Sequence, residues 1–107
     1  MNYEVFLSKQ ANKDLKKLKE AGLIEKVKVL LEILENDPYK NPPYFEKLLG
    51  KLEGAYSRRI NVQYRLVYSV DDKEKMVYVE RLWTHYEYML YFSWLKSLTG
   101  IGVISII

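Results

Sequence analysis

The sequence predicts an α+β domain: an N-terminal strand and a helical hairpin pack on one face of a small antiparallel β-sheet, and an atypical apolar tail follows. Apolar residues recur with a helical period up to about residue 36, and with a period of two after about residue 54. The length of 107 residues suits one domain with its own core. Because the chain has no cysteine and one histidine, we expect neither a metal nor another cofactor.

The first elements are a strand and a one-sided helix. Residues 3–7 are mainly aromatic and β-branched, which is typical of a strand. Ser8 can then cap a helix, because its hydroxyl can accept a hydrogen bond from a backbone N–H of the first turn. The helix is expected to run to about Glu20 and to end at Gly22, where glycine readily adopts a left-handed conformation. Its apolar face consists of Ala11, Leu15 and Leu18.

A second one-sided helix is predicted from about Leu23 to Leu34 and should pair with the first as a hairpin. The sequence Asn-Asp-Pro at 36–38 ends it, because the residue before a proline disfavours the helical conformation. Residues 37–45 contain three prolines, so they predict a loop that leads from the helices to the sheet.

The second half of the domain predicts an antiparallel meander of three strands. These strands are residues 55–61, 64–70 and 75–83. In the middle strand Leu66 and Tyr68 share one face and Arg65 lies on the other. Since the apolar face should carry the helices, Arg65 is expected to point away from them. A charge inside a central strand is uncommon unless it is paired or faces a functional surface.

Several residues could support metal-free cleavage of RNA. That reaction needs a base for the 2′-hydroxyl proton, a cation for the phosphorane and an acid for the departing 5′-oxygen. His85 could be the acid, because it is the one side chain expected to titrate near neutral pH. Arg65 could supply the cation, and Glu46 would serve as the base if the fold brings it near. The net charge is only +3, so any RNA-binding surface must be local. The basic residues that cluster in the sequence are Lys47, Lys51, Arg58, Arg59 and Arg65.

Each of these residues also has a simpler interpretation. A lone histidine near a strand end is usually an ordinary surface or hydrogen-bonded residue. In Arg58-Arg59 one side chain would point outward, and the other would lie along the sheet with its stem packed on aromatic rings.

Four segments taken together resemble the Txe/YoeB family of bacterial toxins within the RelE superfamily. They are Phe-Glu-Lys-Leu at 45–48, Leu-Glu-Gly-Ala-Tyr-Ser-Arg-Arg-Ile-Asn at 52–61, Tyr-Arg-Leu-Val-Tyr at 64–68, and His-Tyr at 85–86. The resemblance covers residues from about 3 to 87. It implies a RelE-like fold and a ribosome-dependent endoribonuclease that cuts mRNA in the A site. It also implies inhibition by a YefM-type antitoxin, with homodimers as another possible assembly. A cytoplasmic location is the default, because the N-terminus does not resemble a secretory signal.

The resemblance also assigns roles to residues. Glu46 matches the family's general base, Arg65 its phosphate-stabilising arginine and His85 its general acid. Tyr86 matches the tyrosine beside that acid. The basic residues expected to contact RNA are Arg58, Arg59, Lys47 and Lys51.

The chain departs from the family at Tyr64, where histidine is frequent, and at its C-terminal end. Residues 1–87 are predicted to form the toxin domain and residues 88–107 an apolar extension. The extension is long enough for a membrane span, yet Lys96 and two nearby glycines argue against one, so no membrane contact is expected unless it inserts. It could instead form a short helix over residues 88–98.

Two other functions stay open at the level of sequence. The basic patch could bind an antitoxin, RNA or the ribosome without any catalysis, in which case its affinity would fall steeply with salt. Alternatively, the protein could act on membranes through its tail.

Overall fold

The computed structural model describes residues 2–49 and 53–85, and for His85 it describes the backbone. The predicted C-terminal extension, residues 88–107, lies outside this range. The described elements, in chain order, are β1 Glu4–Leu7, α1 Lys9–Glu20, α2 Ile24–Asn36, β2 Phe45–Lys47, β3 Ala55–Arg59, β4 Tyr64–Asp71 and β5 Met76–His85. The α+β fold predicted from the sequence is confirmed.

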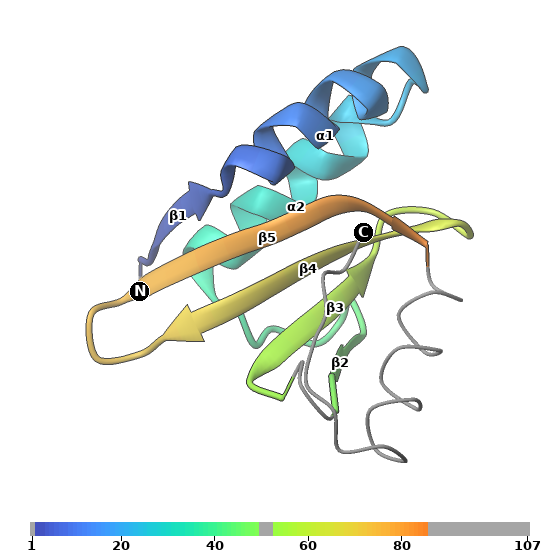
Figure 1. The fold of residues 1–107 in the computed structure, drawn as a ribbon. Helices are drawn as coiled ribbons and strands as arrows, with labels where there is room; N and C mark the ends of the chain where they lie inside the picture. The colour runs from blue at the N-terminus through green and yellow to red at the C-terminus, as the bar shows by residue number, and fades with distance from the viewer. Residues whose placement is uncertain (1, 50–52, 86–107) are drawn as a thin grey trace, which may run out of the picture.

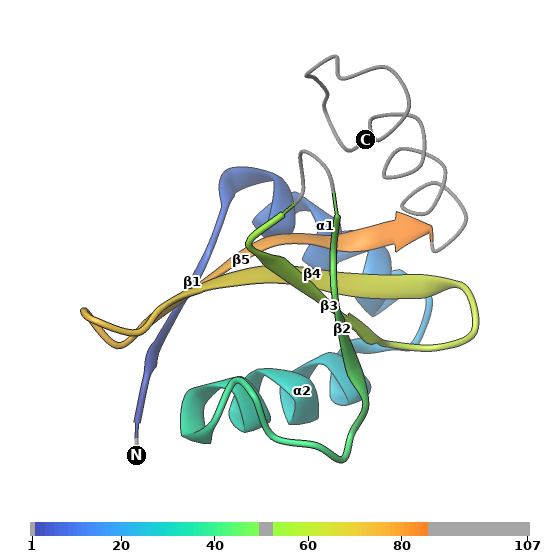
Figure 2. The same ribbon diagram turned by 90° about the horizontal axis from the view of Figure 1, so that it is seen from below.

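The five strands form one sheet in the order β1-β5-β4-β3-β2, with both helices on one face (Figures 1 and 2). Strands β3, β4 and β5 pair antiparallel, as predicted, and β2, which was not predicted, pairs antiparallel with β3. Strand β1 is different, because it joins the sheet by pairing parallel with β5, so the five-stranded sheet is mixed, which the sequence did not predict. Parallel pairing requires a long crossover connection, and the helical hairpin lies within the connection between these strands.

The helix boundaries follow the predicted signals closely. Ser8 Oγ accepts a hydrogen bond from Ala11 N at 2.9 Å, which confirms Ser8 as the N-cap of α1. Gly22 has φ +75°, in the left-handed region that glycine tolerates, between α1 and α2. Helix α2 ends at Asn36, two residues later than Leu34, and the backbone N–H of Asp37 still donates to Ile33 O. The prolines that follow do not shorten the helix.

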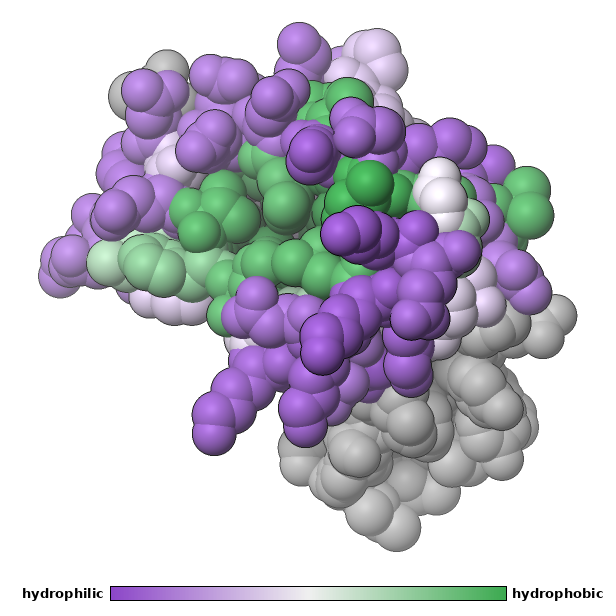
Figure 3. Space-filling view, turned by 90° about the horizontal axis from the view of Figure 1, so that it is seen from above, coloured by the Kyte–Doolittle hydropathy of each residue, from purple (hydrophilic) through white to green (hydrophobic). Residues whose placement is uncertain are grey.

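The core lies between the helices and the sheet. Its fully buried members include Leu18, Val27, Leu34, Leu66 and Tyr68. Hydrophilic side chains surround a band of apolar ones when the molecule is viewed from the helix side (Figure 3). Leu48 and Val67 form a separate small cluster with Ala55. Within the described residues, no helix has both the length and the apolar character needed to span a membrane.

A buried carboxylate joins α1 to β5. Asp14 has no exposed surface, and its Oδ2 accepts hydrogen bonds from Arg81 Nε at 2.9 Å, Leu82 N at 2.9 Å and Trp83 N at 3.2 Å. Burial acts to raise the pKa of Asp14, but the hydrogen bonds from Arg81, Leu82 and Gln10 outweigh it and hold the pKa below its usual range. Asp14 therefore satisfies backbone N–H groups of β5 beyond the end of β1.

Replacing this carboxylate should give a pH-dependent loss of stability. Asp14→Asn removes the buried carboxylate charge that Arg81 Nε contacts at 2.9 Å, so we expect the free energy of unfolding at pH 7 to fall by about 3 kcal/mol. A carboxyl whose pKa is lowered by folding contributes stability above its unfolded pKa of about 3.9 and loses it as the pH falls through the folded pKa. The difference between wild type and Asp14→Asn in urea unfolding should therefore shrink below about pH 4.

The matched control for this experiment is Glu25→Gln. Glu25 lies 3.6 Å from Lys28 in an exposed pair, and exposed pairs contribute about 0 to 1 kcal/mol. A loss of stability for Asp14→Asn that stays the same at pH 3 would show that shape, and not charge, is what Asp14 contributes.

Candidate active site

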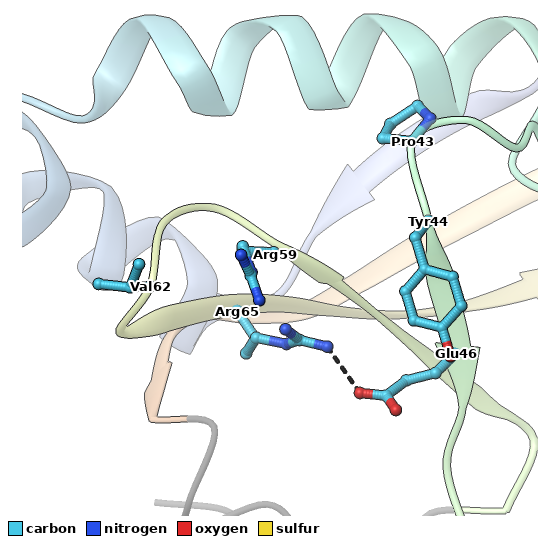
Figure 4. A pocket seen from close by; sticks show the side chains of 6 residues that line it. All are labelled: Pro43, Tyr44, Glu46, Arg59, Val62 and Arg65. Carbon is cyan, nitrogen blue, oxygen red and sulfur yellow. Dashed lines mark hydrogen bonds and ion pairs between the residues drawn. The ribbon is translucent and has the colours of Figure 1, made fainter.

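An ion pair joins two strands on the face of the sheet opposite the helices. Arg65 Nη2 lies 2.6 Å from Glu46 Oε1 (Figure 4). In addition, Arg65 Nε donates to Ser57 Oγ at 3.0 Å. The side chain of Arg65 is 7% exposed and that of Glu46 is 24% exposed. The fold thus brings the expected base and the expected phosphate-binding cation into direct contact.

Strand register explains why these residues meet. In β2, Glu46 pairs with Ser57 of β3, and in β3 Arg59 pairs with Arg65 of β4. Paired residues of antiparallel strands project to the same face, and alternate residues of one strand share a face. The prediction that Arg65 faces away from the helices is confirmed, because its neighbours Leu66 and Tyr68 lie in the core on the other side.

The ion pair lies at the edge of an open cleft with a volume of about 590 Å³. The charged lining residues are Glu46, Arg59 and Arg65, and Arg59 is exposed. The other lining residues are Pro43, Tyr44 and Val62. Figure 4 shows Tyr44 and Glu46 on one side of the cleft and Val62 at the turn on the other side. The open cleft thus contains charged side chains and has an apolar side chain, Tyr44 or Val62, on each side.

Arg58 has a structural position, and its burial does not fit the expectation that it contacts RNA. Its side chain is fully buried. Arg58 Nη1 donates to Pro43 O at 2.6 Å, and Nη2 donates to Pro38 O and Lys40 O, each at 2.9 Å. Arg58 Nε donates to the Tyr68 hydroxyl at 3.2 Å. The guanidinium therefore satisfies carbonyl groups of the proline-rich loop and does not reach the surface.

Aromatic contacts complete this anchor. The Arg58 guanidinium carbon lies 4.7 Å from the centre of the Phe45 ring, a cation–π distance. Burial raises the pKa of Tyr68 to about 12, so its hydroxyl stays protonated and donates to Pro38 O at 2.7 Å. Since Phe45 directly precedes Glu46, Arg58 fixes the segment that carries the expected base.

The other predicted residues are placed as follows. Lys47 is exposed, but its pairing with Tyr56 puts it on the sheet face opposite to that of Glu46. The backbone of His85 ends β5 and pairs with Tyr64, the residue before Arg65. Lys51 and Tyr86 lie outside the described residues. Strand register therefore brings the chain position of the expected acid close to that of the arginine.

Ser57, which accepts a hydrogen bond from Arg65, and the cleft residues Pro43, Tyr44 and Val62 were not predicted as site residues from the sequence. Ser57 could have been found, because it alternates with Arg59 along one strand and so shares its face. Tyr44 and Val62 lie outside regular elements, where periodicity gives no direction to a side chain. Their high exposure beside the cleft marks them as candidate site residues, and it can be seen only in the structure.

The arrangement is suited to a phosphate ester. The Arg65 and Arg59 guanidinium groups can bind phosphate oxygens, and the Glu46 carboxylate can accept a proton within the same cleft. Among residues 2–49 and 53–85, no three His, Cys, Asp or Glu side chains gather as potential metal ligands.

A family model matches most of the described part of the chain. Residues 7–88 match the model of the YoeB-like toxin of bacterial type II toxin-antitoxin systems. The chain belongs to this family. The matched range spans all the residues that line the cleft as well as the end of β5.

Individual relatives of the YoeB type support the same conclusion. The chain is 33% identical to the toxin YoeB from Synechocystis sp. over 55 residues, which are 51% of this chain and 64% of that toxin, so the match spans less than two thirds of that relative. It is also similar to the YoeB–YefM complex from Staphylococcus aureus, with 34% identity, a TM-score of 0.65 and coverage of 80% of this chain and 100% of that chain. The YoeB dimer from the same organism gives 32% identity and a TM-score of 0.64 with the same coverage.

Proposed function

We propose that this YoeB-like toxin is a ribosome-dependent endoribonuclease that cuts mRNA in the A site by metal-free acid and base catalysis. The observation that supports this most strongly is the Glu46–Arg65 ion pair, which lies at an open basic cleft on the face of the sheet opposite the helices. A proton acceptor and a phosphate-binding cation thus lie side by side, as the 2′-hydroxyl and the phosphoryl oxygens of one nucleotide linkage require.

The proposed reaction is an internal transesterification. Glu46 takes the proton from the 2′-hydroxyl, and the 2′-oxygen then attacks the phosphorus. Arg65 binds the phosphoryl oxygens as negative charge develops, which requires the phosphate to compete with Glu46 for its N–H groups. His85 gives a proton to the 5′-oxygen as the P–O bond breaks, and Tyr86 lies next to it in the chain. The products are a 2′,3′-cyclic phosphate and a 5′-hydroxyl.

Binding of RNA outside the reacting atoms falls to the basic side chains. Arg59 is exposed in the cleft and is the first of these. Lys47 and Lys51 are proposed to contact the backbone farther from the cleaved bond. Arg58 is left out of this set, because it is buried.

The proposed protein partner is an antitoxin of the YefM type, which forms a complex with the similar YoeB of Staphylococcus aureus. A homodimer is proposed as a second assembly, since the YoeB of that organism also occurs as a dimer. Because the proposed substrate is mRNA on the ribosome, the proposed site of action is the cytoplasm.

The proposal is tested with purified toxin and ribosomes programmed with a short mRNA. We expect cleavage within the A-site codon when that site is vacant, with a 2′,3′-cyclic phosphate on the upstream fragment. The matched control is the same mRNA with a 2′-deoxy nucleotide before the cut, which should stay intact because it lacks the nucleophile. Cleavage of the deoxy mRNA, or no cleavage of either, would contradict the proposal.

A further inference from the structure

The cleft beside the Glu46–Arg65 pair has two strongly exposed apolar side chains. Tyr44 is 66% exposed and Val62 is 86% exposed. Within the described residues, neither belongs to a hydrophobic cluster. They line opposite sides of the cleft, with Tyr44 in the segment entering β2 and Val62 in the turn between β3 and β4 (Figure 4). Exposed apolar groups around a charged cleft indicate a ligand with both a charged and an apolar part.

The backbone on both sides of Tyr44 is fixed. The carbonyl of Pro43, directly before it, accepts a hydrogen bond of 2.6 Å from Arg58. Phe45, directly after it, stacks on the same guanidinium and pairs with Arg58 in the sheet. A tyrosine has only two side-chain torsions, so a ring carried by a fixed backbone loses little entropy when a ligand stacks on it.

We infer that Tyr44 is the stacking platform for one unpaired nucleobase of the RNA, next to the phosphate that Arg65 binds, with Val62 as the opposite wall. The inference rests on the proposed function and extends it to a base-binding subsite. A nucleotide has the required combination of parts, because its phosphate is anionic and its base presents an apolar face. In the cleft, Arg59 and Arg65 can bind the phosphate, and the Tyr44 ring can stack on the base.

The charged residues that line the cleft favour RNA over a hydrophobic peptide as the occupant. A peptide that buried apolar side chains here would also take the exposed Arg59 guanidinium out of water without supplying an anion to it, and burying a charge in that way is costly. A nucleotide leaves the arginines bound to phosphate. Stacking also accepts any base, since every base has a π-face, so the subsite should select single-stranded RNA more strongly than it selects sequence.

The test measures binding, so it does not depend on cleavage. The probe is a ribosome programmed with an mRNA whose A-site codon and the two nucleotides that flank it are 2′-O-methylated and cannot be cut. In separate complexes, each of these nucleotides in turn is made abasic. We expect Tyr44→Ala to weaken binding to the intact mRNA by about 5- to 150-fold. At the abasic position that removes the stacked base, wild type should lose affinity by the same factor. Tyr44→Ala should bind this abasic mRNA no more weakly than it binds the intact one.

Three variants make the result specific to an aromatic ring. Tyr44→Phe should bind like wild type, and Tyr44→Leu should be nearly as weak as Tyr44→Ala, because leucine cannot stack. Phe6→Ala is the matched control, since Phe6 is an aromatic residue with 41% exposure on β1, at the other edge of the sheet from β2. It should leave binding unchanged.

The outcomes separate this inference from the proposed function. If Tyr44→Ala binds like wild type, or loses the same factor on every abasic mRNA, the ring does not stack on a base and the subsite is refuted even where cleavage is observed. If one abasic position removes the effect of Tyr44→Ala but the unmodified mRNA is never cut, the subsite stands and the nuclease proposal fails.

Discussion

Glu46→Gln and His85→Ala are each expected to lower the rate of mRNA cleavage by about 10²- to 10⁴-fold, which is the usual contribution of one proton transfer. Glutamine keeps a carbonyl oxygen that can accept the hydrogen bond from Arg65, so Glu46→Gln removes the base while leaving the 2.6 Å contact possible. Cleavage is measured under single-turnover conditions on programmed ribosomes, and growth arrest is scored in cells that express each variant.

The matched control is Glu53→Gln, because Glu53 is an exposed acid of the same region that does not line the cleft. Binding to ribosomes should stay within a few-fold of wild type for all three variants, since the proton transfers take place after binding. If either catalytic variant still arrests growth as fully as wild type, the corresponding role as base or acid is refuted.

Arg58→Met is expected to lower the free energy of unfolding by about 3 to 5 kcal/mol. The buried guanidinium donates four hydrogen bonds, three of them to loop carbonyls and one to Tyr68, and methionine can donate none. Arg58→Lys should be nearly as harmful, because one ammonium cannot reproduce the planar set of donors. The quantity is measured by urea unfolding of the purified protein.

The neighbouring residue provides the control for this prediction. Arg59→Met changes an exposed side chain and should alter the free energy of unfolding by no more than about 0.5 kcal/mol, while weakening RNA binding. The opposite pattern, with a stable Arg58→Met that binds RNA poorly, would restore Arg58 to the RNA-binding surface and contradict its structural role.

These two arginines show how far the sequence predicts the site. Strand alternation requires Arg58 and Arg59 to lie on opposite faces, but it does not say which one is buried. The answer depends on the loop carbonyls of Pro38, Lys40 and Pro43, which come from a segment without periodicity. The face of Arg65 was predictable, because the apolar residues of its strand mark the side of the core.

In the fold, too, local features could be predicted from the sequence and long-range contacts could not. The Ser8 cap and the Gly22 end of α1 are local features, and the sequence predicts both correctly. Asp14 appears as a surface residue in a lysine-rich helix, yet it is buried because distant backbone N–H groups need an acceptor. Similarly, strand β2 has only three residues and follows a proline-rich loop, so nothing in its own sequence marks it as a strand.

The contact between α1 and β5 has a mechanical consequence. Asp14 binds the backbone N–H groups of Leu82 and Trp83, and β5 ends at His85, two residues farther on. The docking of one helix therefore sets the position of the proposed acid, whereas Glu46 is held separately through Arg58. A ligand that moved α1 along the sheet would shift the backbone that carries the proposed acid, relative to the proposed base, without entering the cleft. The proposed cleavage activity would then be open to control from the helix face of the sheet.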